Sequence, residues 1–321
     1  MDPHGPIAGL PRLALGGAAL GGLYTPVDDH AATEVVDLAL LRGLTYIDTT
    51  PLYGHGVSEA RIGRALRRAD RTTFTISTKV GRLVDPASAD ERDIDMFADA
   101  PPTRIVRDYS AAAVLRSIES SIQRLGVSHL DIVYVHDPED HMEQALAETV
   151  PTLLKLRDEG VIGAVGVGTN QVDVPERFIR EGDVDVVLLA RRWTLLDRTA
   201  QSLLDRCATR GVPVVLGGIM NLGLLADPEH NQTFDYVPAP PHLIRAAQAM
   251  RKACQRRQAP LSTAAIQHGF RHPAVRSVLV GCRSAGEVEA AAQSSAGEID
   301  DDLWAELDQH AVTLGNTGSR S

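Results

Sequence analysis

Strand-like and helix-like segments alternate along almost the whole chain, and this alternation constrains the fold more than any other feature. Each short apolar run is followed by a longer segment whose apolar residues recur at helical spacing. Repeated units of this kind give parallel strands joined by right-handed crossovers. One strand is expected before residue 20, and seven more at 44–50, 74–80, 131–137, 162–170, 185–190, 213–218 and 277–281. The sequence therefore predicts a (β/α)₈ TIM barrel.

The connecting helices carry start and stop signals. Ser58 and Ser110 are expected to cap helix starts, Gly43 and Gly126 to end helices, and Pro151 to kink or split its helix. A doubly wound open sheet is the alternative fold, but no GxGxxG motif follows the first strand. The expected helices are 30–43, 58–69, 110–126, 141–160, 175–182, 198–211, 242–258, 260–273, 284–295 and 301–312.

A length of 321 residues suits one barrel domain spanning 1–321. Two polar, proline-containing insertions, 82–109 and 225–241, interrupt the alternation. Both follow strands, so we expect them to leave the rim at the carboxyl ends of the strands and to cover the substrate. Residues 314–321 are expected to form a flexible tail.

Composition narrows the class of partner. The net charge is 32 − 42 = −10 and no Lys/Arg-rich block stands out, which argues against a nucleic-acid partner. The sequence contains no run of about 18 apolar residues, so no membrane helix is predicted. The N-terminus lacks the basic start of a signal peptide. The three cysteines are widely separated, which indicates free thiols in a reducing compartment. We expect a cytoplasmic monomer or weak homo-oligomer.

Four residues with complementary chemistry follow or end three consecutive strands. Asp48 ends the first of these strands, and Tyr53 lies in the PLYGHG loop beyond it. Lys79 and His136 end the next two. In a barrel of parallel strands all four lie on the rim that carries catalysis.

A carboxylate, a phenol, an ammonium and an imidazole together suit proton transfer at a C–O bond. A lone tyrosine has a pKa near 10, but a neighbouring ammonium favours the phenolate. Lys79 could supply that charge while Asp48 orients it, and His136 could hydrogen-bond the reacting oxygen. The matching hydride transfer needs a carrier that no side chain provides, and a nicotinamide cofactor would supply it.

The same stretches resemble the aldo-keto reductase superfamily. YIDTTPLYGHGVSEARIGRAL is similar to its Asp-and-Tyr motif, STKVGR to its Lys strand and YVHDP to its His strand. The resemblance extends from LALGGAALGG to VLVGCRS. It implies a barrel, a catalytic tetrad of Asp48, Tyr53, Lys79 and His136 with Tyr53 as the general acid/base, and NADP or NAD as cofactor.

Several further stretches are similar to the aldose 1-dehydrogenase branch of that superfamily, which oxidises a cyclic hemiacetal hydroxyl to a lactone. These are SIQRLGVSHLDIVYVHD, PTLLKLRDEGVIGAVGVGTN, LLARRWTLLD and VVLGGIMNLGLLA. The branch includes L-fucose and D-threo-aldose dehydrogenases, with pyridoxal 4-dehydrogenase as a close relative. A carbonyl or pyridoxal reductase and a nicotinamide-binding regulatory subunit remain as alternatives. The implied substrate is a small sugar or aldehyde.

The resemblance also implies cofactor contacts. Thr169 and Asn170 match the pair that contacts the nicotinamide amide, and Trp193 occupies a position where a ring could stack. The segment that cradles the pyrophosphate corresponds to Gly218, Ile219, Asn221 and Leu222, and the segment near the adenosine phosphate to Gly281, Arg283 and Glu287.

Departures from the family pattern leave the choice between NAD and NADP open. Ala190 and Gly217 replace a glutamine and a stacking aromatic, and Ala290 and Ala291 replace a Glu-Asn pair near the adenine.

Each residue also has a structural interpretation. Asp48 could anchor a loop, Lys79 could lie on the surface, and Tyr53, His136 and Trp193 could simply be packed. Arg191 and Arg192 could bind an anion or form salt bridges. His268 and His272 lie four residues apart on an expected helix, but no third ligand is evident and no metal is predicted.

Overall fold

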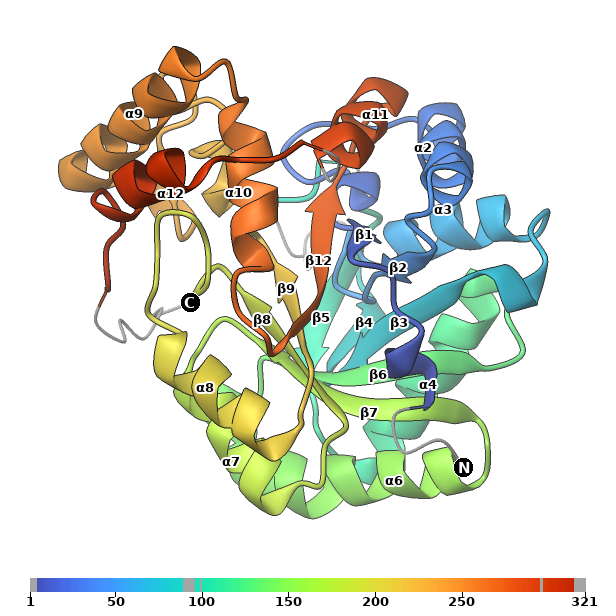
Figure 1. Cartoon of the computed structure of the whole chain (residues 1–321). Coiled ribbons are helices and arrows are strands. Elements are labelled where there is room, and N and C mark those ends of the chain that lie inside the picture. Colours follow the sequence, from blue (N-terminus) through green and yellow to red (C-terminus); the bar gives the residue numbers. More distant parts are fainter. Residues whose placement is uncertain (1–4, 89–95, 99, 295–296, 315–321) are drawn as a thin grey trace.

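The computed structural model describes residues 5–88, 96–98, 100–294 and 297–314, and its centre is a closed barrel of eight parallel strands (Figure 1). The strands follow one another around the barrel in the order β1-β12-β9-β8-β7-β6-β3-β2. This confirms the predicted (β/α)₈ barrel. The strands are β1 (Leu13–Gly16), β2 (Tyr46–Asp48), β3 (Thr75–Val80), β6 (Leu130–His136), β7 (Ile162–Thr169), β8 (Val186–Ala190), β9 (Val214–Gly217) and β12 (Val275–Gly281).

Successive residues of each strand face opposite sides of the barrel wall, as the two-residue period of a strand requires. On β6, Ile132 and Tyr134 belong to the cluster that fills the barrel, whereas Val133 and Val135 belong to the layer under the helices. Tyr46 on β2 also points inward. The short helix α1 (Gly5–Ala8) contributes Ile7 to the same inner cluster.

The helices surround the barrel close to where the sequence predicted them (Figure 1). Ser110 caps its helix, since its side chain accepts a hydrogen bond from the Ala113 amide. Ser58 does not cap a helix: Gly56 precedes the first turn, and Ser58 Oγ donates instead to the Gly17 carbonyl at 2.8 Å. The main helices are α2 (Asp29–Leu41), α3 (Val57–Leu66), α4 (Ala111–Leu125), α6 (Val150–Asp158), α7 (Asp173–Glu181), α8 (Gln201–Arg210), α9 (Pro241–Arg256), α10 (Leu261–Gly269), α11 (Ala285–Ser294) and α12 (Asp301–Asp308).

The expected helix 141–160 is divided, as Pro151 predicted. A short helix, α5 (Met142–Gln144), passes through a π-helical turn, η4 (Ala145–Thr149), into α6. Pro151 directly follows this π-helical turn, in which the Val150 amide donates to the Ala145 carbonyl five residues back, and the widened turn accommodates a residue without an N–H.

Both insertions contain hairpins. Within 82–109, β4 (Arg82–Pro86) pairs with β5 (Thr103–Arg107), and the intervening residues 89–95 and 99 lie outside the described part. Within 225–241, β10 (Thr233–Phe234) pairs with β11 (Val237–Pro238). The expected tail lies outside the described residues except for Leu314.

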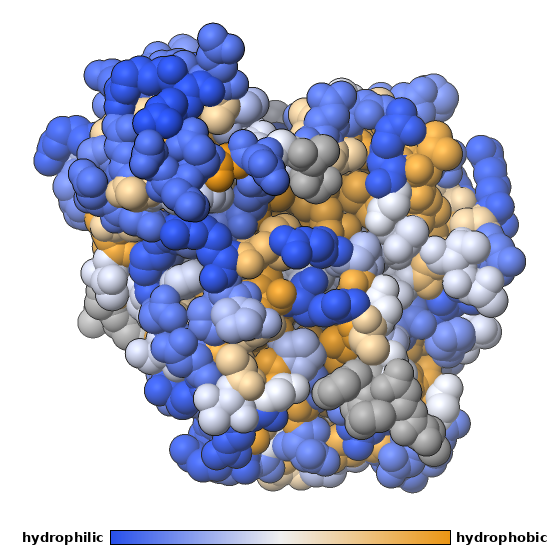
Figure 2. Space-filling view, viewed as in Figure 1, coloured by the Kyte–Doolittle hydropathy of each residue, from blue (hydrophilic) through white to orange (hydrophobic). Residues whose placement is uncertain are grey.

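Hydrophilic residues dominate the face shown in Figure 2, and apolar residues show through between them. In the described part of the chain, every helix is too short or too polar to cross a membrane.

Candidate active site

Asp48 and Lys79 form an ion pair inside the barrel mouth. Lys79 Nζ lies 2.7 Å from Asp48 Oδ2 and 2.9 Å from the Thr49 carbonyl oxygen. Both side chains are almost fully buried, at 3% and 2% exposure. They come from adjacent strands, β2 and β3, and face the same side. Since burying either charge alone is costly, the pair fixes both groups in one arrangement.

Tyr53 lies in the loop after β2, above this ion pair. Lys79 Nζ is 5.0 Å from the centre of its ring, within the range of a cation–π contact. The loop is held against the segment that follows β1: a Cβ atom on Gly54 would come within 2.4 Å of the Gly21 carbonyl oxygen, and Gly54 has a φ of +62°. The sequence GHG after Tyr53 therefore permits a close approach that fixes the phenol over the mouth.

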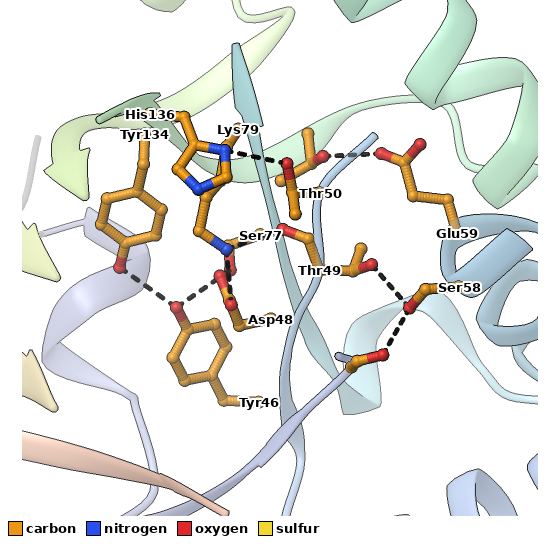
Figure 3. A network of polar contacts seen from close by, with 12 residues as sticks. Tyr46, Asp48, Thr49, Thr50, Ser58, Glu59, Ser77, Lys79, Tyr134 and His136 are labelled. Carbon is orange, nitrogen blue, oxygen red and sulfur yellow. Dashed lines mark hydrogen bonds and ion pairs between the residues drawn. The ribbon is translucent and has the colours of Figure 1, made fainter. Parts of the chain in front are cut away.

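A chain of hydroxyl groups runs from Asp48 into the barrel (Figure 3). Ser77 Oγ donates to Asp48 Oδ1 at 2.7 Å. Tyr46 OH is 3.0 Å from Ser77 Oγ and 3.1 Å from Tyr134 OH. Because Ser77 has one proton and gives it to the carboxylate, Tyr46 donates to Ser77 and Tyr134 donates to Tyr46. Every donor in this hydroxyl chain thus points toward Asp48.

His136 ends β6 and is neutral at neutral pH. Burial, followed by the charges of Arg82, Lys79 and Arg107, lowers its pKa well below the ordinary value. Its Nδ1 lies 3.3 Å from Thr50 Oγ1. If Thr50 donates to Nδ1, the ring carries its proton on Nε2, which leaves Nε2 as the donor available to a substrate oxygen.

The pKa of Tyr53 does not shift in the direction expected from its lysine neighbour. Burial raises this pKa well above the ordinary value, and the charges of Asp48, Tyr236 and Asp137 add to the increase, although part of the residue remains exposed. The ammonium of Lys79 is directed at Asp48, whose negative charge opposes its effect on the phenol. Tyr53 is therefore a protonated phenol at neutral pH.

Asp137 follows His136 directly and turns its carboxylate toward the same site. Its φ is +43°, a left-handed conformation that Asp tolerates better than most residues. Arg82 Nη2 donates to Asp137 Oδ2 at 2.7 Å, and the same oxygen lies 3.5 Å from His136 Nε2.

The residues expected to contact the nicotinamide lie at the end of β7. Thr169 is buried, and its Oγ1 accepts the Gln171 amide at 3.0 Å. Asn170 is half-buried, and its Oδ1 accepts from Gln171 Nε2 at 3.1 Å. Both side chains keep further hydrogen-bonding capacity.

Trp193 is packed against α10. Its ring centre lies 5.0 Å from that of His268 and 5.8 Å from that of His272, and the guanidinium of Arg198 lies 5.4 Å from it. Only 6% of the residue is exposed. These contacts favour the packing interpretation of Trp193 over stacking on a cofactor.

The loop after β9 contains an unusual concentration of left-handed residues. Gly218, Asn221 and Leu222 have φ values of +61°, +46° and +57°. A Cβ atom on Gly218 would come within 2.6 Å of Arg191 Cγ, so only glycine fits beside that side chain. Ile219 is buried. Asn221 is fully buried, and neither its Oδ1 nor its Nδ2 has a partner among the described residues.

Arg283 joins the end of β12 to the loop after β1. Its Nη2 donates to the Leu23 carbonyl at 3.0 Å, and its backbone amide donates to Glu287 Oε2 at 2.7 Å. Its Nε is buried and has no hydrogen-bond partner in the described part of the chain. Gly281, two residues earlier, is exposed.

The hairpin β10–β11 is tied to the mouth by ion pairs. Asp235 lies 3.1 Å from Arg191 Nε and 2.9 Å from Arg192 Nη2. The Tyr236 ring lies 4.3 Å from the Arg191 guanidinium. The tip of the hairpin is thus held against the two residues that follow β8.

These residues fit a nicotinamide dinucleotide. The amide of Asn221 and the Nε of Arg283 are buried donors that phosphate or amide oxygens of such a cofactor could satisfy. Among the described residues, no three His, Cys, Asp or Glu side chains gather as a metal site would require.

Sequence reasoning missed the hydroxyl chain and Asp137. The missed partners follow a simple rule: Tyr46, Ser77 and Tyr134 each lie two residues before Asp48, Lys79 and His136, respectively. Residues two apart on a strand face the same side, so the sequence did contain the pattern that identifies these partners. The link from Asp137 to Arg82 joins residues 55 positions apart in the chain and had no local signal.

Comparison with known proteins places these features in a family. Residues 12–312 match the Aldo/keto reductase family. The chain is 36% identical to a D-threo-aldose 1-dehydrogenase from a Pseudomonas species, covering 95% of this chain and 96% of the relative. It is 35% identical to a pyridoxal 4-dehydrogenase from Microbacterium luteolum, covering 92% of each. The solved holo form of an aldo-keto reductase from Bacillus halodurans has the same fold, with a TM-score of 0.78 and 22% identity over 97% of this chain and 95% of that chain.

Proposed function

Because the chain belongs to the aldo/keto reductase family and is an NAD(P)-dependent oxidoreductase, we propose that it oxidises the C1 hydroxyl of an aldose to the lactone. The observation that carries this proposal is the buried Lys79–Asp48 pair directly beneath the Tyr53 ring, beside the neutral imidazole of His136. The likeness to a D-threo-aldose 1-dehydrogenase over nearly the whole chain supports an aldose as substrate.

In the proposed mechanism Tyr53 takes the proton of the C1 hydroxyl. His136 donates a hydrogen bond from Nε2 to the same oxygen and holds it in line. Lys79 stabilises the phenolate that has to form before Tyr53 can act as a base, and Asp48 fixes the lysine. A bound nicotinamide dinucleotide would supply the acceptor for the hydride that leaves C1.

The cofactor-binding residues are proposed on the side of the mouth formed by β7, β8, β9 and β12. Thr169 and Asn170 would bind the nicotinamide amide. Gly218, Ile219, Asn221 and Leu222 would surround the pyrophosphate, and Gly281, Arg283 and Glu287 would lie at the adenosine end. The choice between NADP and NAD depends on whether Arg283 meets a 2′-phosphate. We propose that the insertions 82–109 and 225–241 cover the substrate. The support is that ion pairs of Asp235 hold the tip of the second insertion against Arg191 and Arg192, which follow β8 at the mouth.

Oxidation of pyridoxal is a second candidate function, favoured by the 35% identity to a pyridoxal 4-dehydrogenase. The same four side chains would serve it, because a cyclic hemiacetal of pyridoxal presents an equivalent hydroxyl. Carbonyl reduction is the same chemistry in the reverse direction and uses the protonated Tyr53.

The proposal is tested by following reduced-nicotinamide absorbance with NAD or NADP across L-fucose, D-arabinose, L-galactose and pyridoxal. We expect turnover of at least one aldose, with the lactone as product. Turnover of pyridoxal without any aldose would select the second candidate. Carbonyl reduction without oxidation of any member of the panel would exclude both dehydrogenase functions.

A further inference from the structure

Asp137 and Arg82 form a polar pair beside the reacting groups that the mechanism above does not use. Arg82 begins β4, so it enters the site from the first insertion, while Asp137 enters from the end of β6. Their side chains are 15% and 23% exposed, and they meet at 2.7 Å. The pair thus lies at the edge of the mouth, partly open to a ligand.

The backbone holds Asp137 in place. Its amide donates to the Gly168 carbonyl at 2.9 Å, and its carbonyl accepts the Tyr109 hydroxyl at 2.8 Å. The left-handed conformation at this residue turns the side chain back toward His136. A left-handed conformation at a residue other than glycine, fixed at its amide, its carbonyl and, through Arg82, its carboxylate, is the kind of feature found at functional sites.

The carboxylate is not committed to His136. The distance of 3.5 Å between Asp137 Oδ2 and His136 Nε2 is long for a hydrogen bond. The imidazole is neutral, because burial and the neighbouring cations lower its pKa. Asp137 Oδ1 has no hydrogen bond to any residue that the structure describes, so at least one acceptor remains for a donor from outside.

We propose that Asp137, held by Arg82, accepts a hydrogen bond from the C2 hydroxyl of the sugar and so selects hydroxylated substrates. This inference rests on the proposed oxidation at C1. His136 Nε2 and Asp137 Oδ2 lie side by side, and hydroxyl oxygens on adjacent carbons of a sugar ring are spaced to meet two such neighbours. With O1 at His136 and Tyr53, the hydroxyl on C2 is the donor that reaches Asp137.

The surroundings agree with a ligand rich in hydroxyl groups. Arg82 Nε and Glu139 Oε2 are buried beside Asp137, and neither has a hydrogen-bond partner among the described residues. Burial, with the charge of Asp137, also raises the pKa of Glu139. A carboxylate without enough donors discriminates against a substrate that lacks the hydroxyl. Binding such a substrate removes water from the carboxylate without giving it a hydrogen bond in return.

The test compares the wild type with Asp137→Gly and Asp137→Asn on the best aldose of the panel and on its 2-deoxy counterpart. Glycine tolerates the φ of +43°, and asparagine keeps the shape while losing the charge. We expect Asp137→Gly to lower kcat/KM for the aldose by about 10- to 100-fold while changing it for the 2-deoxy sugar less than about threefold. Asp137→Asn should also reduce the ratio of kcat/KM for the aldose to kcat/KM for its 2-deoxy counterpart.

Asp140→Ala is the matched control, since Asp140 lies on the same loop, is 69% exposed and pairs with Arg107 at 3.4 Å. It should leave both substrates unchanged. Equal losses on the two sugars in Asp137→Gly, or a wild type that does not prefer the 2-hydroxyl, would overturn the inference while leaving C1 oxidation intact. If Asp137→Gly fails to fold, an unchanged preference in Asp137→Asn overturns it. A wild type that oxidises no aldose removes the proposed function and this inference with it.

Discussion

The strand ends of β2, β3 and β6, which carry the ion pair and the hydroxyl chain, differ from the half of the barrel mouth formed by β8, β9 and β12 in how their buried polar groups are paired. At these strand ends Asp48, Lys79 and Ser77 have partners within the protein. Arg82 Nε and Glu139 Oε2, in the loops beyond β3 and β6, are exceptions, since both are buried without a partner among the described residues. In the second half Asn221 and Arg283 retain buried polar atoms without hydrogen-bond partners among the described residues. Arg191 and Arg192 meet Asp235 only as ion pairs.

This difference matches what each half would have to do. A group that transfers a proton gains from being fixed before the substrate arrives, because no reorganisation is then needed during the reaction. A group that binds a large ligand gains from holding its donors ready, because the ligand then supplies the missing partners. We call the first the paired half and the second the unpaired half, and the two should respond differently to substitution.

The largest expected effect separates chemistry from binding. Tyr53→Phe removes the acid/base hydroxyl, and we expect turnover to fall by about 100- to 10,000-fold while the affinity for the nicotinamide cofactor is retained. Single-turnover kinetics and fluorescence titration of the cofactor would measure the two quantities. Wild-type rates in this variant would exclude Tyr53 as the proton-transfer group.

Arg283→Ala acts on the unpaired half. If Arg283 meets the 2′-phosphate, we expect the Kd for NADP to rise by about 10- to 100-fold, since a hydrogen bond between charged groups is lost. The Kd for NAD should change much less. Arg276→Ala, an exposed arginine earlier on β12, is the control. Equal weakening of both cofactors would show that Arg283 does not distinguish them.

The direction of the Tyr53 pKa shift predicts different pH profiles for the two directions of reaction. Burial raises this pKa, so the base form grows as pH rises and the rate of oxidation should increase by up to about tenfold per pH unit. Carbonyl reduction requires the protonated phenol, which stays the dominant form over the same range, so its rate should stay flat and fall only as the pH approaches the raised pKa. Parallel profiles in both directions would place the controlling ionisation elsewhere.

The sequence predicted the paired half better than the unpaired half, for a physical reason. Asp48, Lys79 and His136 end strands, and the strand period fixes which way they face. The βα alternation accordingly predicted the rim on which Asp48 and Lys79 form their ion pair, with Tyr53 and His136 beside it. Their catalytic roles stay a prediction until the kinetics are measured.

Trp193 and Asn221 show where sequence reasoning stops. Both lie in loops, whose course depends on tertiary contacts. Trp193 packs on His268, which lies 75 positions later in the chain, through a contact that no local pattern encodes. Asn221 lies in a loop with several left-handed residues, one of which, Leu222, has no preference for that conformation. Ser58 failed as a helix cap because the helix begins one residue earlier, at Val57, and its hydroxyl donates to the Gly17 carbonyl instead.

Ser77→Ala tests whether pairing matters in the paired half. The substitution removes the donor to Asp48 Oδ1, and we expect kcat to fall about tenfold with little change in KM, together with a lower melting temperature. Tyr134→Phe, two hydrogen bonds further from Asp48, should reduce kcat less than about twofold. If Tyr134→Phe costs as much turnover as Ser77→Ala, the hydroxyl chain acts through packing and not through Asp48.

The smallest expected effect is the most direct test of the comparison. Asn221→Gly removes a buried amide that has no partner among the described residues, and glycine suits its φ of +46°. We expect cofactor affinity to fall by about two- to tenfold. The melting temperature without cofactor should stay unchanged or rise, because an unsatisfied group no longer has to be buried. Gln258→Gly, at an exposed residue with a φ of +56°, controls for the effect on stability of introducing a glycine at a left-handed position. A clear loss of stability in Asn221→Gly but not in Gln258→Gly would mean that the amide already stabilises the protein alone, and the contrast between the halves would disappear.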